Sequence, residues 1–229
     1  TVIYIHGGGW LGGDKDTRVF FLEPFLRQGW NAVNLNYRQG PQTAPAAVLD
    51  VLYAMKWLTQ NAAKYSIDPQ NIILMGDSAG GHLALMAGII NSSPEERDKD
   101  YYTGEQIKIR AIVNLYGISD LKSFDEYGTQ KYAGRSSVRT WIGNQDVEAV
   151  EQAYSPRYRV SGPMPPVITF HGKKDSTVPF AQSIDLHNEL DKKNVRNKLV
   201  GFANGTHGGF SHNEWEYMYQ EIFRFLAAD

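Results

Sequence analysis

The sequence predicts an α/β fold with a mostly parallel sheet and helices on both of its faces. Short apolar runs alternate along the chain with longer stretches in which apolar residues recur at helical spacing. Most of the short runs are apolar throughout, as expected for strands whose two faces are both covered. The length of 229 residues suits one large domain, so we assign residues 1–229 to a single unit.

Six strands are predicted, each a short run rich in apolar or β-branched residues. The runs are Val2–Ile5, Ala32–Asn36, Ile72–Met75, Ala111–Leu115, Val167–Phe170 and Lys198–Phe202. The spacing between consecutive runs leaves room for crossover helices, which parallel neighbours require.

Helices are predicted between and after these strands. They are Thr17–Gln28, Ala46–Tyr65, Gly81–Ile90, Phe180–Lys193 and Trp215–Leu226. Gly29 closes the first helix, and Asp68-Pro69 forms a turn after the second. The last helix presents Met218, Ile222 and Phe225 on one stripe.

Residues 122–162 do not follow this alternation, because the segment is polar and rich in Tyr, Gly and Ser. Insertions of this size are uncommon and often functional, so a small lid is one interpretation. A surface connection with a helix near Asp146–Gln152 is the other.

The composition excludes several classes of protein. The net charge is −2 and the basic residues are scattered, so we expect no nucleic-acid partner. The chain has no cysteine, which excludes disulfides, thiolate metal sites and a cysteine nucleophile. No apolar run approaches the ~20 residues that span a bilayer, so we expect no membrane partner. A cytoplasmic location is favoured over secretion, and the oligomeric state stays open.

The most informative motif is Gly76-Asp77-Ser78-Ala79-Gly80, which lies between a predicted strand and a predicted helix. A serine between two glycines at this corner is typical of a nucleophile elbow, where a sharp turn exposes the hydroxyl. The alternative is an ordinary glycine-rich turn. Ser78 is therefore the candidate nucleophile.

A serine nucleophile needs a base to accept its proton and an acid to orient that base. Asp175 follows the strand Val167–Phe170, and His207 follows the strand Lys198–Phe202. Their order after Ser78 is the one this architecture uses, and carboxyl ends of parallel strands are where such sites lie. His212 is the main competitor for the base and Asp120 for the acid.

Donors for a tetrahedral oxyanion are also present. One is the amide of Ala79, directly after the nucleophile. The second donor is expected from His6-Gly7-Gly8-Gly9-Trp10, because three glycines let the backbone bring its amides next to a substrate. The loop lacks the residues of a P-loop or a dinucleotide fingerprint.

His6-Gly7-Gly8-Gly9-Trp10 together with Gly76-Asp77-Ser78-Ala79-Gly80-Gly81 resembles the α/β-hydrolase esterases of the hormone-sensitive-lipase-like and bacterial feruloyl/acetyl-esterase-like groups. The resemblance runs from Val2 to His207 or beyond, and Asn36-Tyr37-Arg38 shares it. It implies the α/β-hydrolase fold and the following roles: Ser78 as nucleophile, His207 as general base and acid, Asp175 as its partner, Gly8, Gly9 and Ala79 as the oxyanion hole, and Trp10 as a wall of the acyl pocket or a packing residue.

Two departures from the resembled groups are visible. Two strands that usually precede the first strand are absent, which leaves Ala32–Asn36 as a sheet edge in a minimal or truncated chain. The large N-terminal cap is also missing, which favours the smaller feruloyl/acetyl-esterase-like group.

The predicted function is a serine carboxylic-ester hydrolase that acts through an acyl-enzyme, without metal or organic cofactor. Its substrate would be a small ester with a short acyl chain or an acetyl or feruloyl group on carbohydrate. An amide hydrolase, such as a formamidase or peptidase, would use the same residues. A non-catalytic binding protein with this fold is the third possibility.

Overall fold

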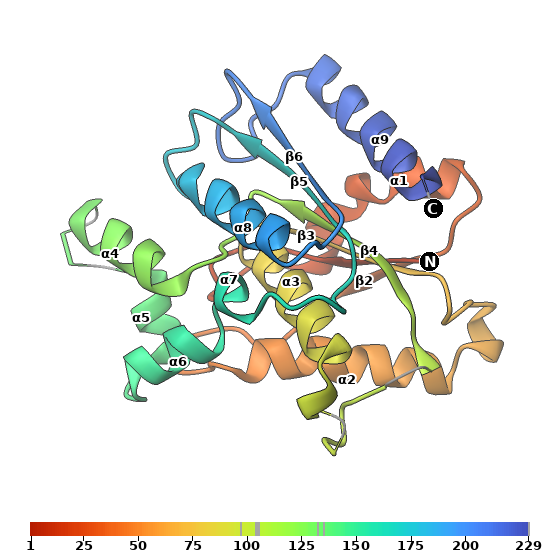
Figure 1. Ribbon diagram of the computed structural model, residues 1–229, viewed down its shortest axis with the longest axis horizontal. Helices are drawn as coiled ribbons and strands as arrows, with labels where there is room; N and C mark the ends of the chain where they lie inside the picture. Colours follow the sequence, from red (N-terminus) through yellow and green to blue (C-terminus); the bar gives the residue numbers. More distant parts are fainter. Residues whose placement is uncertain (97, 104–105, 132, 135, 229) are drawn as a thin grey trace.

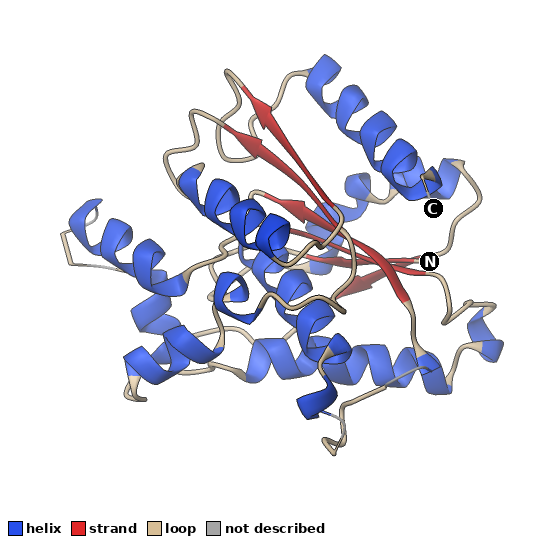
Figure 2. Ribbon diagram, viewed as in Figure 1, coloured by secondary structure: helices blue, strands red, loops and turns tan. Residues whose placement is uncertain are grey.

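The computed structural model describes residues 1–96, 98–103, 106–131, 133–134 and 136–228. Within these residues six strands form one sheet in the order β2-β1-β3-β4-β5-β6, and every neighbouring pair is parallel (Figures 1 and 2). The strands are β1 (Val2–Ile5), β2 (Ala32–Leu35), β3 (Ile72–Asp77), β4 (Ile109–Leu115), β5 (Val167–Gly172) and β6 (Asn197–Phe202). Each lies within two residues of its predicted position, and β2 is a sheet edge as predicted.

The helices connect these strands and follow the last one. They are η1 (Lys15–Phe21), α1 (Glu23–Arg27), α2 (Ala46–Gln60), η2 (Ala63–Tyr65), α3 (Ala79–Ser92), η3 (Pro94–Glu96), α4 (Leu121–Lys131), α5 (Ser137–Ile142), α6 (Val147–Ala153), α7 (Pro156–Arg159), α8 (Ala181–Lys192) and α9 (His212–Ala227). In the described part of the chain, no helix is long and apolar enough to cross a membrane.

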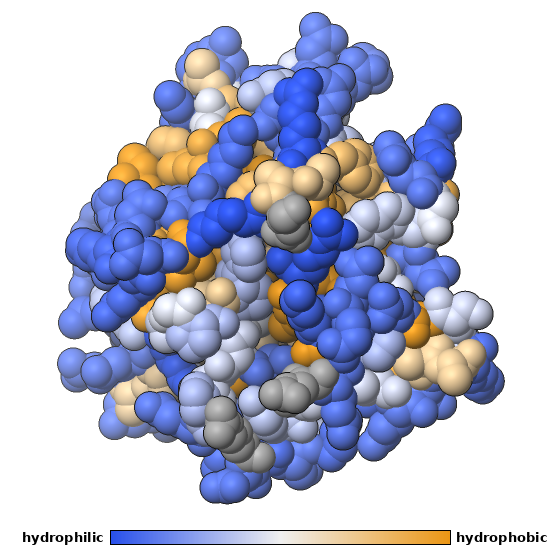
Figure 3. Space-filling view, turned by 45° about the vertical axis from the view of Figure 1, so that its right-hand side comes forward, coloured by the Kyte–Doolittle hydropathy of each residue, from blue (hydrophilic) through white to orange (hydrophobic). Residues whose placement is uncertain are grey.

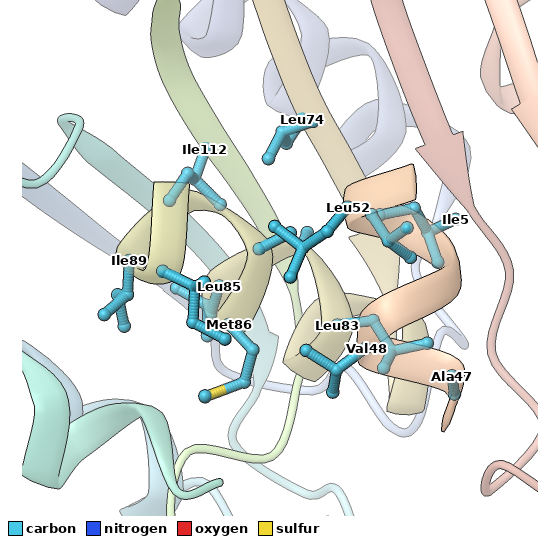
Figure 4. Close-up of a cluster of buried hydrophobic side chains, with 14 of the residues drawn as sticks. Ile5, Ala47, Val48, Leu52, Leu74, Leu83, Leu85, Met86, Ile89 and Ile112 are labelled. Carbon is cyan, nitrogen blue, oxygen red and sulfur yellow. The ribbon is translucent and has the colours of Figure 1, made fainter. Parts of the chain in front are cut away.

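Both faces of the sheet are covered, which explains the continuous apolar runs. Helices α2 and α3 pack their apolar side chains onto one face, where Ile5, Leu74 and Ile112 project (Figure 4). Helices α1 and α9 pack onto the other face through Phe25 and Met218. Successive strand residues therefore enter different cores, as the pleat requires.

The molecular surface is mainly polar. Hydrophilic side chains cover most of the face seen in Figure 3, and apolar side chains gather there in separate patches. The large apolar side chains that are more than half exposed in the described chain are Val19, Phe20, Leu26 and Tyr158.

Two predicted helices were wrong in extent. The predicted helix Thr17–Gln28 is a 3₁₀ segment, η1, followed by the short helix α1, and Pro24 lies in the first turn of α1. Proline has no N–H to donate, so it suits the start of a helix and not the middle of one. Helix α2 ends at Gln60, and residues up to Tyr65 form a separate 3₁₀ turn.

Residues 122–162 contain most of α4 and all of α5, α6 and α7; α4, α5 and α6 lie together at one side of the molecule, and α7 packs against α3 and α8 (Figure 1). Residues 132 and 135 of this range lie outside the described residues. The predicted helix near Asp146–Gln152 is α6, and Asp146 caps it by accepting a hydrogen bond from the Ala149 amide. The segment is thus a small helical layer.

The strand register brings the carboxyl ends of the strands to one edge of the sheet. Gly76 is paired with Ile5, and Leu115 lies between Asp77 and Phe170. Loops that follow β1, β3, β5 and β6 therefore meet at this edge, although they are far apart in the sequence.

Candidate active site

The turn at Ser78 has the geometry of a nucleophile elbow. Ser78 has φ 52° and ψ −120°, a strained combination for a residue with a side chain. Gly76 and Gly80 permit it, because a Cβ on Gly76 would lie 2.3 Å from the carbonyl oxygen of Gly80. A Cβ on Gly80 would lie 2.0 Å from the carbonyl oxygen of Ile5, so the glycine lets α3 approach β1.

The structure brings the three predicted side chains into one hydrogen-bonded chain. His207 Nε2 lies 3.0 Å from Ser78 Oγ, and His207 Nδ1 lies 2.7 Å from Asp175 Oδ2. A carboxylate only accepts, so Nδ1 carries a proton and Nε2 is free to accept one from the serine. Ser78 directly follows β3, and Asp175 and His207 lie in the turns after β5 and β6.

The Asp175 carboxylate is held ionised. Burial alone would raise the pKa of Asp175, but hydrogen bonds from His171 and His207 outweigh burial and hold the pKa well below its usual value. The amides of Thr177 and Val178 donate to its other oxygen, Oδ1, at 2.8 and 2.9 Å. Asp175 can therefore stabilise an imidazolium without taking its proton.

The competing residues lie elsewhere. His212 is the first residue of α9, its side chain is 85% exposed, and it lies 3.2 Å from Glu216. Asp120 is buried in an ion pair with Arg157 and accepts a hydrogen bond from Tyr158. Neither of the two makes a hydrogen bond to Ser78 or His207.

The predicted oxyanion loop lies directly against the elbow, since a Cβ on Gly7 would be 3.1 Å from the Ser78 Cβ. Gly8 and Gly9 have φ of 126° and 60°, so both need glycine's freedom. Among the described residues, the N–H groups of Gly8, Gly9 and Ala79 have no hydrogen-bond acceptor. Three free donors therefore belong to the elbow and to the loop that packs against it.

Two side chains hold the oxyanion loop in place. Asp77 Oδ1 accepts hydrogen bonds from the Gly7 amide at 2.8 Å and from the Tyr4 hydroxyl at 2.7 Å. His6 Nδ1 donates to the Gly7 carbonyl oxygen at 2.7 Å, which fixes the peptide that carries the Gly8 N–H. Both hydrogen-bond donors to Asp77 Oδ1 are 70 or more positions away in the chain, so this contact is not visible in the sequence.

Trp10 is a packing residue in this structure, not an exposed pocket wall. Its side chain has no exposed surface, because its ring stacks on Trp141 at 4.8 Å and lies edge-on to His82 at 5.2 Å. Its indole N–H donates to His82 Nδ1 at 3.2 Å, and His82 Nε2 bonds the Tyr154 carbonyl oxygen. This cluster ties the oxyanion loop to α3 and to the helical layer of residues 122–162.

Two residues at the site were not predicted. The Tyr116 ring, at the end of β4, packs edge-on to His207 at 4.7 Å. His171, the residue before the last of strand β5, lies 3.2 Å from Asp175 Oδ2. The spacing His171-Gly172-Lys173-Lys174-Asp175 is visible in the sequence, but only the folded turn shows that the two side chains meet.

A cavity of about 680 Å³ opens beside this site. Leu11 directly follows the loop His6–Trp10, Thr177 lies two residues after Asp175, and both line the cavity. Its other wall comes from α4 and α5, and the remaining lining residues are Phe124, Gly134, Ser136, Ser137, Arg139 and Thr140. Among the described residues, no cluster of three or more carboxylate or imidazole side chains is placed to hold a metal ion.

A serine, an aspartate and a histidine in this order along the chain, joined by hydrogen bonds through the histidine, with the serine at a strand-to-helix elbow of a parallel sheet, define an α/β hydrolase. The chain belongs to the BD-FAE family, whose model matches residues 1–190.

Relatives of the chain carry esterase names. The probable carboxylic ester hydrolase LipM of Mycobacterium tuberculosis is 30% identical over 203 residues, covering 85% of this chain and 46% of LipM. The esterase LipQ of the same organism is 29% identical over 185 residues, covering 80% of this chain and 44% of LipQ. The chain thus spans about half the length of the curated relatives it matches.

Solved structures share the fold over nearly the whole chain. An acetyl ester-xyloside bifunctional hydrolase from Caldicellulosiruptor lactoaceticus has a TM-score of 0.79 and 26% identity, covering 99% of this chain and 82% of that one. An inhibited esterase B from Lactobacillus rhamnosis has a TM-score of 0.83 at 22% identity, covering 99% of this chain and 76% of that one, which supports the fold alone.

Proposed function

We propose that this protein hydrolyses carboxylic esters through an acyl-enzyme formed on Ser78. The observation that carries the proposal is His207, which bridges Ser78 Oγ at 3.0 Å and Asp175 Oδ2 at 2.7 Å. This is the geometry in which an imidazole can take the serine proton as the oxygen attacks a carbonyl carbon.

The steps follow from the positions of the donors and acceptors. As Ser78 Oγ attacks, its proton moves to His207 Nε2 and the carbonyl oxygen becomes an oxyanion. The N–H groups of Gly8, Gly9 and Ala79 are the proposed donors to this oxygen. The imidazolium then gives its proton to the departing alcohol oxygen, and Asp175 stabilises the ring while it is charged. Water repeats the same sequence on the acyl-enzyme and restores Ser78.

We propose short-chain or carbohydrate-linked esters, with acetyl or feruloyl acyl groups, as substrates. Hydroxyl side chains line the adjacent cavity at Ser136, Ser137, Thr140 and Thr177, and suit a polar alcohol portion. Leu11 and Phe124 supply apolar contacts in the same cavity. A relative of known structure is described as an acetyl ester-xyloside bifunctional hydrolase, which agrees with this choice.

We further propose that residues 122–162 act as one fixed wall of the substrate cavity within a single domain. The Ala44 and Gln42 amides donate to the carbonyl oxygens of Trp141 and Thr140, and Trp141 stacks on the buried Trp10. These contacts tie α5 to the rest of the molecule in the way expected of a wall.

Covalent labelling tests the nucleophile. A fluorophosphonate should modify Ser78, and the adduct should map to that residue by peptide mass spectrometry. The Ser78→Ala variant is the control, and its kcat should fall by several orders of magnitude. Labelling at another serine, or near-normal turnover by the alanine variant, would remove Ser78 from the mechanism.

A substrate panel separates the alternatives. Short acyl chains and acetylated or feruloylated sugars should be turned over faster than long-chain esters. Comparing an ester with the matching anilide tests the amide-hydrolase alternative, which would be favoured by equal or faster anilide cleavage. A protein that is neither labelled nor active would instead be a binding protein with this fold.

A further inference from the structure

The side chain of Asp175 meets a second histidine besides His207. His171 Nε2 lies 3.2 Å from Asp175 Oδ2, the same oxygen that accepts from His207 Nδ1 at 2.7 Å. The side chains of His171 and Asp175 have no exposed surface, so water does not compete for this contact. One carboxylate oxygen therefore serves two imidazoles.

The surroundings of His171 fix the position of its proton. Nε2 also lies 3.0 Å from the Val178 carbonyl oxygen, which can only accept, so Nε2 carries a proton. Nδ1 lies 2.7 Å from the hydroxyl of Ser183, a buried residue of α8. The ring of Phe180 closes the pocket from the side, edge-on at 5.4 Å. The Nε2–H of His171 thus donates to the Val178 carbonyl oxygen and also lies 3.2 Å from the carboxylate.

We infer that His171 is a positioning residue that holds the Asp175 carboxylate and moderates its attraction for the His207 imidazolium. The inference rests on the proposed function, since it concerns the same serine, histidine and aspartate. A donor on Oδ2 draws electron density from that oxygen, so the carboxylate becomes a weaker acceptor for His207. His207 then releases its proton to the leaving alcohol more readily and is free as a base at lower pH.

Other polar residues lie near Asp175 and His207, and none of them is mutated in the test. The buried phenol of Tyr116 packs on His207, and burial raises its pKa well above the usual value. Lys131 and Tyr127 contact the Ser176 carbonyl oxygen on the far side of the turn. Lys174 bonds Asn204 at the turn after β6. A change seen on replacing His171 alone is therefore assigned to its own contacts.

Two replacements at position 171 separate the hydrogen bond from the packing. In His171→Asn the amide nitrogen replaces Nδ1, so the contact with Ser183 is kept and the donor to Asp175 is lost. In His171→Gln the amide nitrogen reaches the position of Nε2, so that donor is kept. Ser183→Ala is the matched control, because it removes the other partner of the same ring. Thermal unfolding establishes that each variant is folded.

The readout is the titration of the His207 ring, followed by NMR in the whole protein, together with the pH profile of kcat/KM. In His171→Asn the His207 midpoint should rise by about 0.5 pH unit, about a threefold change in its proton affinity. The acid limb of kcat/KM should move the same way. His171→Gln should restore most of the shift, and Ser183→Ala should leave the midpoint in place.

A folded His171→Asn variant with an unchanged His207 midpoint would overturn the inference. Equal shifts in all three variants would also overturn it, because packing alone would then explain them. The NMR titration needs no turnover, so it decides the role of His171 even if no ester is hydrolysed. Absence of turnover in the unmodified protein would count against the proposed function alone.

Discussion

Replacing Asp77 by alanine tests whether this carboxylate holds the oxyanion loop against the elbow. Asp77 is 4% exposed, and its Oδ1 accepts from the Tyr4 hydroxyl at 2.7 Å and the Gly7 amide at 2.8 Å. In Asp77→Ala both donors lose their acceptor in a buried place. Each orphaned donor costs about 1–3 kcal/mol, so the free energy of unfolding should fall by about 2–6 kcal/mol.

The kcat of Asp77→Ala should also fall, and the cause is the position of the loop, not the loss of stability. The Gly7 amide no longer anchors the loop, so the proposed oxyanion donors of Gly8 and Gly9 are held less firmly, with the His6 contact to the Gly7 carbonyl oxygen left in place. Such donors act on the transition state, so kcat should fall about tenfold or more while KM changes less. The assays are urea unfolding and steady-state hydrolysis of a short-chain ester.

Asp77→Asn is the matched control, because its side-chain oxygen can still accept from Tyr4 and Gly7. It loses the charge that faces Arg18, whose Nε lies 3.7 Å from Asp77 Oδ2 with a 38% exposed side chain. A pair with so exposed a partner contributes about 0–1 kcal/mol, so the asparagine variant should lose much less stability than the alanine variant. The reasoning is refuted if Asp77→Ala keeps its unfolding free energy within about 1 kcal/mol of the unmodified protein and also keeps its kcat.

Two further predictions concern packing and pH. Gly80→Ala places a Cβ 2.0 Å from the Ile5 carbonyl oxygen, so it should lower the unfolding free energy by about 1–3 kcal/mol. Gly12→Ala is the control, because its Cβ would meet nothing within 4 Å and should leave the unfolding free energy unchanged. Equal melting temperatures of the two variants would contradict this prediction. Burial lowers the pKa of His82 to about 4 despite a hydrogen bond to Tyr154, so below about pH 6.5 the unfolded chain binds a proton that the folded one refuses. The unfolding free energy should therefore fall by about 3 kcal/mol as the pH drops from 7 to 4, and His82→Gln should remove this part of the decline. The assay is urea unfolding across this pH range. An equal decline of the unfolding free energy with pH in both proteins would count against a buried neutral His82.

Two parts of the site show how far local patterns reach. The elbow is readable because Gly76, Ser78 and Gly80 are neighbours whose turn geometry depends on a few backbone torsions. The order of Ser78, Asp175 and His207 is readable because each follows a strand, and parallel strands end at one edge. Both the elbow and the order of the three residues can therefore be recognised without knowing how the side chains pack.

Trp10 shows where such patterns stop. A tryptophan after three glycines suits a pocket wall and a packing residue equally well. Trp10 is a packing residue because Trp141 and His82 bury its ring, and these two residues follow it in the chain by 131 and 72 residues. Asp77 and His171 are similar cases, since their partners are chosen by how the sheet and its turns assemble.

The six strands, the elbow and the three side chains of the proposed mechanism can be read from the sequence, because periodicity and turn chemistry act between near neighbours, whereas α4, α5 and α7 cannot. Three contacts are visible only in the folded chain: Asp77 holds the oxyanion loop, the Trp10 ring is buried, and His171 and His207 share one carboxylate oxygen of Asp175. These pairings depend on which side chains meet after the strands align, and no local pattern records that contact.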